Sequence, residues 1–231
     1  MLTILHHLGL GDAIMLNGMV RHFAEKEDVI IFVKKHQEPS IAFMYRDLSN
    51  IKIIPVDTTH PREMWSQVKG RVLPLATYAL NDDIWNFATS GPVSVLVNWA
   101  HSIYIQAGLP PKYMYSKFKV VRDKNTEIKY EHDDYVFIHD DSTRGMNIEV
   151  SHDNVFRITE DTLKTNPNIF DYLTIIENAK EVHCMDSCYA WLINLMEIGT
   201  PSKNYLHLDT KGNYTPRMVQ TVFGDDVWTY V

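Results

Sequence analysis

The run from Val29 to Val33 constrains the fold of this chain more than any other segment. Its five consecutive residues, Val-Ile-Ile-Phe-Val, are all apolar, so an extended strand here has two apolar faces. A strand of this kind is typical of a parallel sheet that is covered by helices on both faces. The segment therefore predicts an α/β protein.

Strand-like and helix-like segments alternate along the rest of the chain. In the first half, strands are expected at 2–5, 29–33, 51–56 and, more weakly, 71–75, with helices after residue 12, at 41–48 and at 92–107. In the second half, strands are expected at 135–138, 155–158, 181–185 and 205–208, with helices after 167 and at 190–198. Two such arrays, separated by a polar stretch, predict two Rossmann-like parallel sheets. We expect an N-terminal domain over 1–115, a linker over 116–133 and a C-terminal domain over 134–231.

Composition excludes several classes of protein. The net charge is −7, so no overall positive field would attract nucleic acid. The two cysteines, Cys184 and Cys188, provide no disulfide framework, and we expect them to behave as small buried side chains. There is no apolar stretch long enough to cross a membrane and no signal-peptide pattern at the N-terminus, which predicts a cytoplasmic protein.

The first candidate site is the turn Gly9-Leu10-Gly11-Asp12, between the first strand and the first helix. Glycines at such a turn permit positive φ angles and close approach of a ligand to the backbone. Ile14 stands where a dinucleotide fingerprint has its third glycine, so the turn does not predict a dinucleotide site. The simpler alternative for Asp12 is an N-cap of the helix.

The second candidate site follows the strand at 135–138. His139 ends this strand, and Ser142, Thr143 and Arg144 come next, with hydroxyls and a guanidinium suited to phosphate. In open α/β sheets, ligands bind beyond the carboxyl ends of the strands. The alternative is a polar surface loop. No D-x-D pair occurs in the sequence, so we expect no bound metal and no cofactor.

The third candidate site is Asp186-Ser187, between the strand at 181–185 and a helix that is almost entirely apolar. Such a helix must be buried, which would hold the turn rigidly, and rigid elements make precise sites. Ser187 is also a typical helix N-cap, and that role alone would explain it.

Taken together, these segments resemble the heptosyltransferase family of GT-B glycosyltransferases. HHLGLGDAIMLNGMVRHFAEK (6–26) is similar to the opening of that family, where an L-G-D turn leads into the first helix. IIENAKEVHCMDSCYAWLINLM (175–196) is similar to its donor-site stretch, and QAGLP (106–110) to the element that closes its N-terminal domain.

The resemblance implies a metal-independent, inverting transfer of a hexose or heptose from a nucleotide sugar to a hydroxyl of a glycan or glycolipid. It implies that Asp12 is the catalytic base. It also implies a set of residues that contact the donor, one in the glycine turn and seven in the second half of the chain. They are Gly11, His139, Ser142, Thr143, Arg144, Asp186, Ser187 and Cys188. The sequence departs from the family pattern at Cys188, where the family has glycine, and at Trp191, where it has histidine. It is also shorter than typical members.

Two alternatives remain open at this point. One is a nucleotide-sugar epimerase of the same fold. The other is a binding protein that has kept the fold without the chemistry. The L-G-x-G-D turn with a later Asp-Ser is also comparable with fucosyltransferases of similar fold, which leaves the donor sugar open.

Overall fold

The structure of the chain is a computed structural model that describes residues 1–6, 9–56, 66–75, 99–142, 145–208, 223 and 226–231. The chain forms two compact units, Met1–Val121 and Arg122–Val231. Each unit is built around its own parallel sheet.

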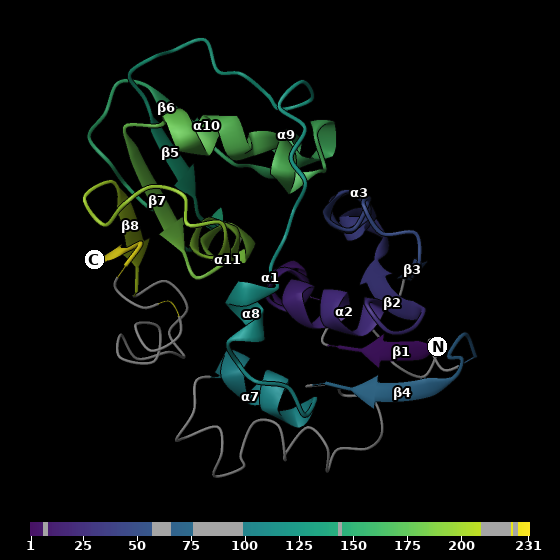
Figure 1. Ribbon diagram of the computed structural model, residues 1–231. Helices are drawn as coiled ribbons and strands as arrows, with labels where there is room; N and C mark the ends of the chain where they lie inside the picture. The colour runs from purple at the N-terminus through teal and green to yellow at the C-terminus, as the bar shows by residue number, and fades with distance from the viewer. Residues whose placement is uncertain (7–8, 57–65, 76–98, 143–144, 209–222, 224–225) are drawn as a thin grey trace. The chain divides into compact units, whose positions relative to one another are not determined.

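The sheet of the first unit has four strands in the order β3-β2-β1-β4 (Figure 1). The strands are β1 (Leu2–Leu5), β2 (Val29–Lys34), β3 (Ile51–Val56) and β4 (Arg71–Pro74). All three pairings are parallel, and Leu2 pairs with Val29 on one side and with Arg71 on the other. Residues 29–33 are all buried, which confirms that this run is a strand with two covered faces.

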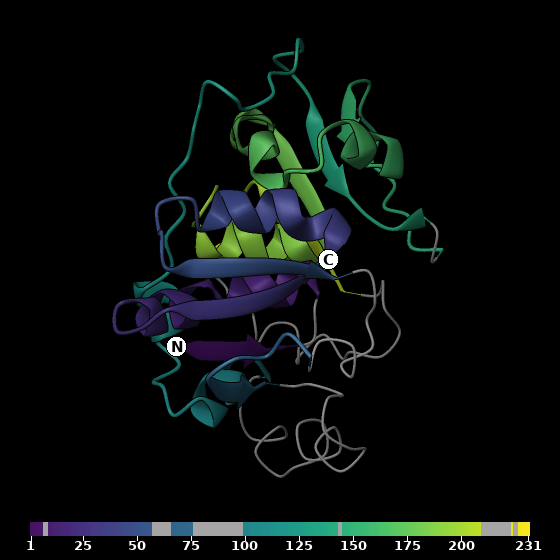
Figure 2. The same ribbon diagram turned by 90° about the vertical axis from the view of Figure 1, so that its right-hand side faces the viewer.

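Helices connect these strands. Helices α1 (Leu10–Met15) and α2 (Asn17–Ala24) follow β1. A 3-10 turn, η1 (Lys35–Gln37), and α3 (Glu38–Met44) follow β2. Figure 2 shows α3 lying along β3. The apolar residues of α3 that face inward, Ile41 and Met44, are fully buried.

The last helices of this unit are α7 (Trp99–Gln106) and α8 (Tyr113–Ser116). Helix α8 packs against α2, and α7 contacts α1 and α2 through Tyr104. The Tyr104 hydroxyl donates to the Met15 carbonyl at 2.8 Å and accepts from the Met19 amide at 3.2 Å. It thereby satisfies backbone groups at the junction between α1 and α2. A Cβ on Gly18 would lie 2.1 Å from the Tyr113 carbonyl oxygen, so only glycine lets α8 approach this closely.

The chain after α8 is held against the first unit. The Asn17 side chain bonds the Lys119 backbone twice, accepting from its amide at 2.9 Å and donating to its carbonyl at 3.2 Å. The Arg46 guanidinium donates to the carbonyl of Val121, the last residue of the unit, at 2.8 Å. Lys119 and Val121 are therefore both attached to the first unit by side-chain hydrogen bonds.

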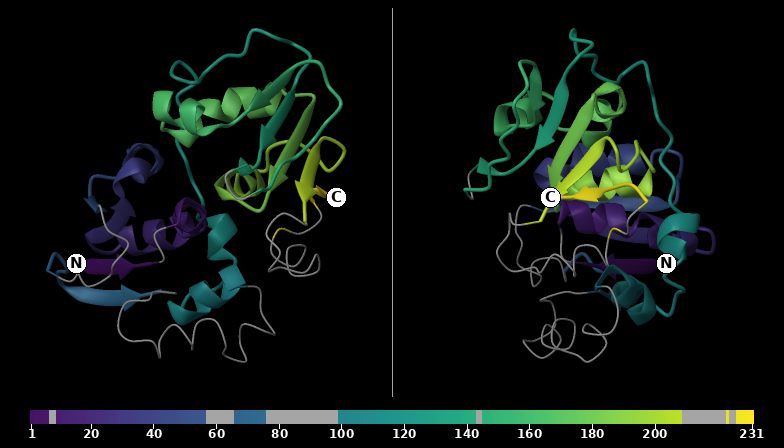
Figure 3. Two further views of the ribbon diagram at one scale, coloured as in Figure 1. Left: turned by 180° about the vertical axis from the view of Figure 1, so that it is seen from behind. Right: turned by 90° about the vertical axis from the view of Figure 1, so that its left-hand side faces the viewer.

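The sheet of the second unit has five parallel strands in the order β6-β5-β7-β8-β9. They are β5 (Val136–His139), β6 (Val155–Arg157), β7 (Glu181–Met185), β8 (Asn204–His207) and β9 (Thr229–Tyr230). The connecting elements are α9 (Glu160–Thr165), η3 (Ile169–Tyr172), α10 (Leu173–Asn178) and α11 (Cys188–Leu195). Figures 1 and 3 show α10 and α11 on the same face of this sheet.

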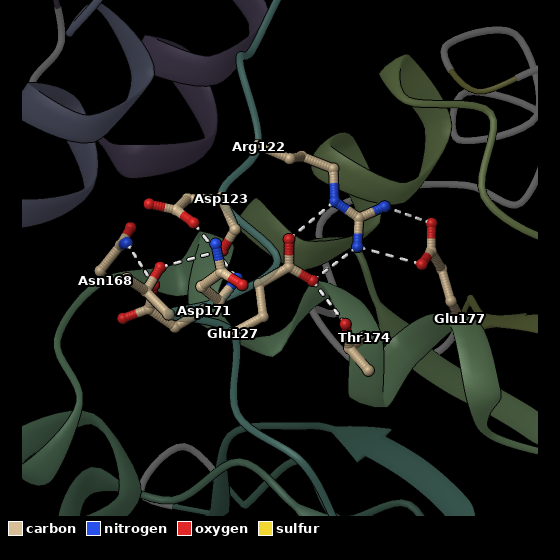
Figure 4. Close-up of polar contacts among 9 residues, drawn as sticks. Arg122, Asp123, Glu127, Asn168, Asp171, Thr174 and Glu177 are labelled. Carbon is tan, nitrogen blue, oxygen red and sulfur yellow. Dashed lines mark hydrogen bonds and ion pairs between the residues drawn. The ribbon is translucent and has the colours of Figure 1, made fainter.

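An ionic network around the buried Glu127 ties the first residues of the second unit to α10 (Figure 4). The Arg122 guanidinium donates to both Glu127 oxygens, at 2.8 and 2.6 Å, and also to both oxygens of Glu177. The Thr174 hydroxyl donates to Glu127 at 2.6 Å. Burial raises the pKa of Glu127, but the hydrogen bonds from Arg122 and Thr174 outweigh it and the net pKa is lowered. Glu127 is therefore a buried carboxylate that stays charged.

The structure confirms the predicted α/β class and the predicted strands. The helix expected over 41–48 begins earlier, as α3, because Pro39 stands in its first turn, where proline is well tolerated. It ends at Met44, and Tyr45 has left the helical conformation. The described part of the helix expected at 92–107 begins at residue 99 and is helical up to Gln106. The sequence analysis missed α8, α9 and the short edge strand β9. No helix among the described residues is long and apolar enough to cross a membrane.

We predict that Arg122→Ala destabilises the second unit by about 2–4 kcal/mol, because it leaves the buried Glu127 carboxylate without its cation. Hydrogen exchange in peptides covering 122–134 and 168–178 should rise together. Arg71→Ala is the matched control, since its guanidinium is exposed and its partner Glu27 lies at the surface of the first unit. Unchanged exchange in the Arg122 variant would show that the network is not needed to hold this segment.

Candidate functional site

The candidate site lies at the carboxyl edge of the second sheet. Strands β5, β7 and β8 are neighbours and run parallel, so their last residues meet at one edge. His139 pairs with Cys184, and Met185 pairs with His207. This edge is where ligands bind in open α/β sheets.

A hydrogen bond joins the ends of β5 and β7. His139 Nδ1 lies 2.9 Å from Ser187 Oγ. Ser187 is the N-cap of α11, and its hydroxyl oxygen accepts from the Ala190 amide at 3.4 Å. The expected N-cap role of Ser187 is confirmed. The contact also brings together two of the three segments that the sequence singled out.

Aromatic packing holds the His139 ring in place. Its centroid lies 4.5 Å from that of Tyr189, which in turn packs on Phe137 at 5.7 Å. Tyr189 is fully buried, and burial raises the pKa of its phenol well above the ordinary value. Burial does the same to the thiol of Cys184 beneath. The Tyr189 phenol and the Cys184 thiol, both buried next to this junction, are therefore uncharged at neutral pH.

Asp140, the residue after His139, is engaged in a structural contact. Its carboxylate is buried, pairs closely with the Arg157 guanidinium and accepts from the Ile148 amide at 2.8 Å. Arg157 also donates to the Ile148 carbonyl at 2.9 Å. Within the described ranges, no group of three or more His, Cys, Asp or Glu side chains has the arrangement of a metal site.

The loop after Asp140 is described only in part. Ser142 is exposed, while Thr143 and Arg144 lie outside the described residues. Asp141 forms an isolated antiparallel bridge with Met146, closed by mutual backbone hydrogen bonds of 3.0 Å. Gly145 has a φ of +70°, a value that glycine adopts without strain. The backbone therefore reverses direction between Asp141 and Met146, and the exposed Ser142 lies within this reversal.

Asp186 and Cys188 flank Ser187. Asp186 follows β7 directly, and Cys188 is the first residue of α11. Both side chains are half-buried. Cys184 is buried as expected, whereas Cys188 is partly accessible; both are thiols. The role of Asp186 and Cys188 in holding a donor remains a prediction.

In the first unit, the glycines before Asp12 do not have the positive φ angles that the sequence suggested. Gly9 is the N-cap of α1, with a φ of −77°, and Gly11 lies inside the helix. Positive φ is therefore not the reason for glycine at position 9. A Cβ there would lie 2.2 Å from Asp12 Oδ2, so glycine makes room for the Asp12 carboxylate, which folds back over the helix start.

The structure also shows that the simpler interpretation of Asp12, as the N-cap of the first helix, is wrong. The helix begins at Leu10, so Asp12 is the third helical residue and not the N-cap. A carboxylate in the first turn still lies in the favourable field of the helix N-terminus. Its catalytic role remains a prediction.

Sequence reasoning missed a chain of polar side chains on β7 and β8. Glu181, His183 and His207 are linked by hydrogen bonds across the two strands. The signal was present in the sequence: Glu181 and His183 alternate along a strand whose other residues are apolar. The partner His207 is distant in sequence, and only the strand register brings it close.

Comparison with known proteins identifies a similar fold but does not assign the chain to a family. No family model matches the sequence, and no curated protein does. The structure is similar to the crystal structure of the bacterial iron-containing dodecameric glycosyltransferase TibC from enterotoxigenic E. coli H10407, with a TM-score of 0.55 and 15% sequence identity. The match covers 93% of this chain and 60% of that protein, so the chain spans about three fifths of its length. The two all-parallel sheets are GT-B-like, which confirms the predicted fold class, α/β with two Rossmann-like parallel sheets.

We predict that Ser187→Ala loosens the first turn of α11 and costs about 1 kcal/mol, because the Ala190 amide loses its cap. Amide exchange at 188–191 measures the effect. Ser187→Asn should restore most of the protection, since asparagine is an equally good cap. Ser202→Ala, at an exposed position, is the control. Equal protection in all of these proteins would mean that Ser187 does not cap the helix.

Proposed function

We propose that this chain is a glycosyltransferase that moves a sugar from a nucleotide-sugar donor to a hydroxyl acceptor, with inversion and without a metal. The observation that carries the proposal is the junction of His139 and Ser187 at the start of α11. The likeness of the fold to a glycosyltransferase supports it, as does the resemblance of 6–26 and 175–196 to heptosyltransferases.

The second unit would hold the donor. The amides at the start of α11 and the Ser187 hydroxyl offer hydrogen bonds to a diphosphate, and the helix dipole favours negative charge there. Arg144 would add a planar cation that bonds phosphate with two donors. These groups would stabilise the nucleoside diphosphate as it departs with the electron pair of the broken bond.

The first unit would supply the base. As the acceptor oxygen bonds to the anomeric carbon from the side opposite the diphosphate, its proton passes to the Asp12 carboxylate. If the proton is removed late, when the new oxygen–carbon bond is largely formed, the position of Asp12 matters more than its basicity. Gly9 is consistent with this proposal because it leaves room for the Asp12 carboxylate at the start of the helix.

Donor binding is the first test. We predict that one nucleoside diphosphate, from ADP, GDP, UDP and CDP, raises the melting temperature by mass action and does so equally with EDTA. Arg144→Ala should weaken this binding about tenfold or more, since a charge-assisted contact is lost. Lys164→Ala, on the exposed face of α9, is the control. No response to any nucleotide would contradict a transferase, and binding that requires a divalent ion would contradict the metal-free mechanism.

Loss of the proposed base is the second test. We predict that Asp12→Asn folds and binds donor normally but transfers sugar roughly two to four orders of magnitude more slowly. Asp28→Asn is the matched control, because Asp28 is exposed just before β2, at the opposite end of the strands. Transfer at the parental rate by the Asp12 variant would place the base elsewhere. Epimerised donor without transfer would favour the epimerase alternative.

A further inference from the structure

One histidine of the first unit is buried between two helices. His22 lies on α2 and is only 9% exposed. Its ring lies against that of Tyr113, the first residue of α8, with the ring centroids 4.9 Å apart. Helix α8 packs against α2, and a Cβ on Gly18 would already collide with Tyr113. His22 is therefore part of the surface of α2 on which α8 rests.

Charged side chains from both sides of this contact surround the ring. The Lys26 ammonium lies 3.3 Å from His22 Nε2, and the Glu25 carboxylate lies 3.8 Å from His22 Nδ1. Lys117, which directly follows α8, pairs with both oxygens of Glu25 at 2.6 and 2.8 Å and lies over the Tyr113 ring. In the described part of the chain, the charged groups that act on His22 are two cations, Lys26 and Lys117, and one carboxylate, Glu25.

These contacts match a neutral His22. An ammonium group only donates hydrogen bonds, so His22 Nε2 accepts from Lys26 and the ring proton is carried by Nδ1. The Nδ1 atom is buried, and within the described ranges it has no hydrogen-bond partner, since Glu25 is too distant. Burial, and next the proximity of Lys26 and Lys117, lower the pKa of His22, although Glu25 acts in the opposite direction. The ring is therefore uncharged at neutral pH.

A second proton on the His22 ring does not fit this arrangement. It would be carried by Nε2 and would point at the Lys26 ammonium, so a hydrogen bond would become a contact between two cations. The new charge would also be buried, which is unfavourable unless an anion pairs with it. Glu25 is close enough to do so, but it would then have to leave Lys117, which holds the end of α8 on α2. In both cases, a proton on His22 weakens the contact between the two helices.

We propose that His22 is a pH-sensitive switch that holds α8 on α2 when it is neutral and releases α8 when it is protonated. The released segment would begin at Tyr113 and end before Lys119, whose backbone is bonded separately by Asn17. This segment belongs to the part of the chain that leads from the first unit to the second. The switch does not depend on the proposed transfer reaction, because it involves none of the residues assigned to the donor or to the base.

The pKa of His22 sets the direction of the pH dependence. A free imidazole titrates near pH 6.5, and the pKa of His22 in the docked state lies below that value. The released state therefore binds the proton more tightly, and acidification favours release. Docking of α8 is fully stable above pH 6.5 and loses stability as the pH falls through the pKa of the docked ring. Glu25 stays charged over this range, because the hydrogen bond from Lys117 lowers its pKa from 4.5.

Amide hydrogen exchange in peptides covering 113–118 tests the switch. After correction for the intrinsic effect of pH on exchange, protection of this segment should fall roughly three- to tenfold between about pH 7.5 and about pH 5.5. His22→Phe keeps an aromatic ring in the same place but cannot take up a proton, so its protection should not change over that range. His36→Phe, at an exposed position of the same unit, is the matched control and should respond as the parental protein does. Equal protection at both pH values in the parental protein, or the same loss in His22→Phe, would overturn the inference.

Two further measurements separate the switch from a purely structural role of His22. Lys26→Met removes the facing cation, so the pKa of His22, followed by NMR titration of its ring protons, should rise and the pH response of 113–118 should shrink. Because this variant keeps His22, it tests the inference even where His22→Phe fails to fold. Peptides covering β2 should keep their protection at both pH values. A parallel loss of protection in β2, or a pKa of His22 that is the same in Lys26→Met, would overturn the inference.

Discussion

Parallel strand pairing is the constraint on which the rest of this structure depends. Every pairing in both sheets is parallel, so each strand must be followed by a connection that returns the chain to the same end. The carboxyl ends of all strands in a sheet then meet at one edge. Polar side chains can gather there, and His139 and Ser187 do so.

The same constraint explains what could be predicted from the sequence. Strands covered on both faces have continuous apolar sequences, so the strand at residues 29–33 was identifiable without a structure. Ser187 was identifiable as a cap because its role is local. The contact of Ser187 with His139 was not, because it joins two strands whose order in the sheet is not encoded in either segment. The chain from Glu181 to His207 was missed for the same reason.

The polar stretch between the two arrays shows a different limit. Its charge and low apolar content are typical of a linker, yet Lys119 is bonded to the first unit and Arg122 and Glu127 to α10 of the second. These bonds join residues far apart in sequence, and an ion pair leaves no periodic pattern from which to predict it. The composition of this stretch does not reveal the hydrogen bonds and ion pairs that attach it to the rest of the protein.

Glycine at position 9 illustrates how a motif can be identified for one physical reason and required for another. The turn was selected because glycine permits positive φ, whereas Gly9 has an ordinary extended conformation. The carboxylate of Asp12 instead occupies the space where a side chain at position 9 would begin. A helix start needs no such arrangement, since a carboxylate in the first turn is stabilised by the dipole in several rotamers. Glycine at position 9 therefore permits this placement of the carboxylate, and a group that must meet a substrate proton depends on such placement.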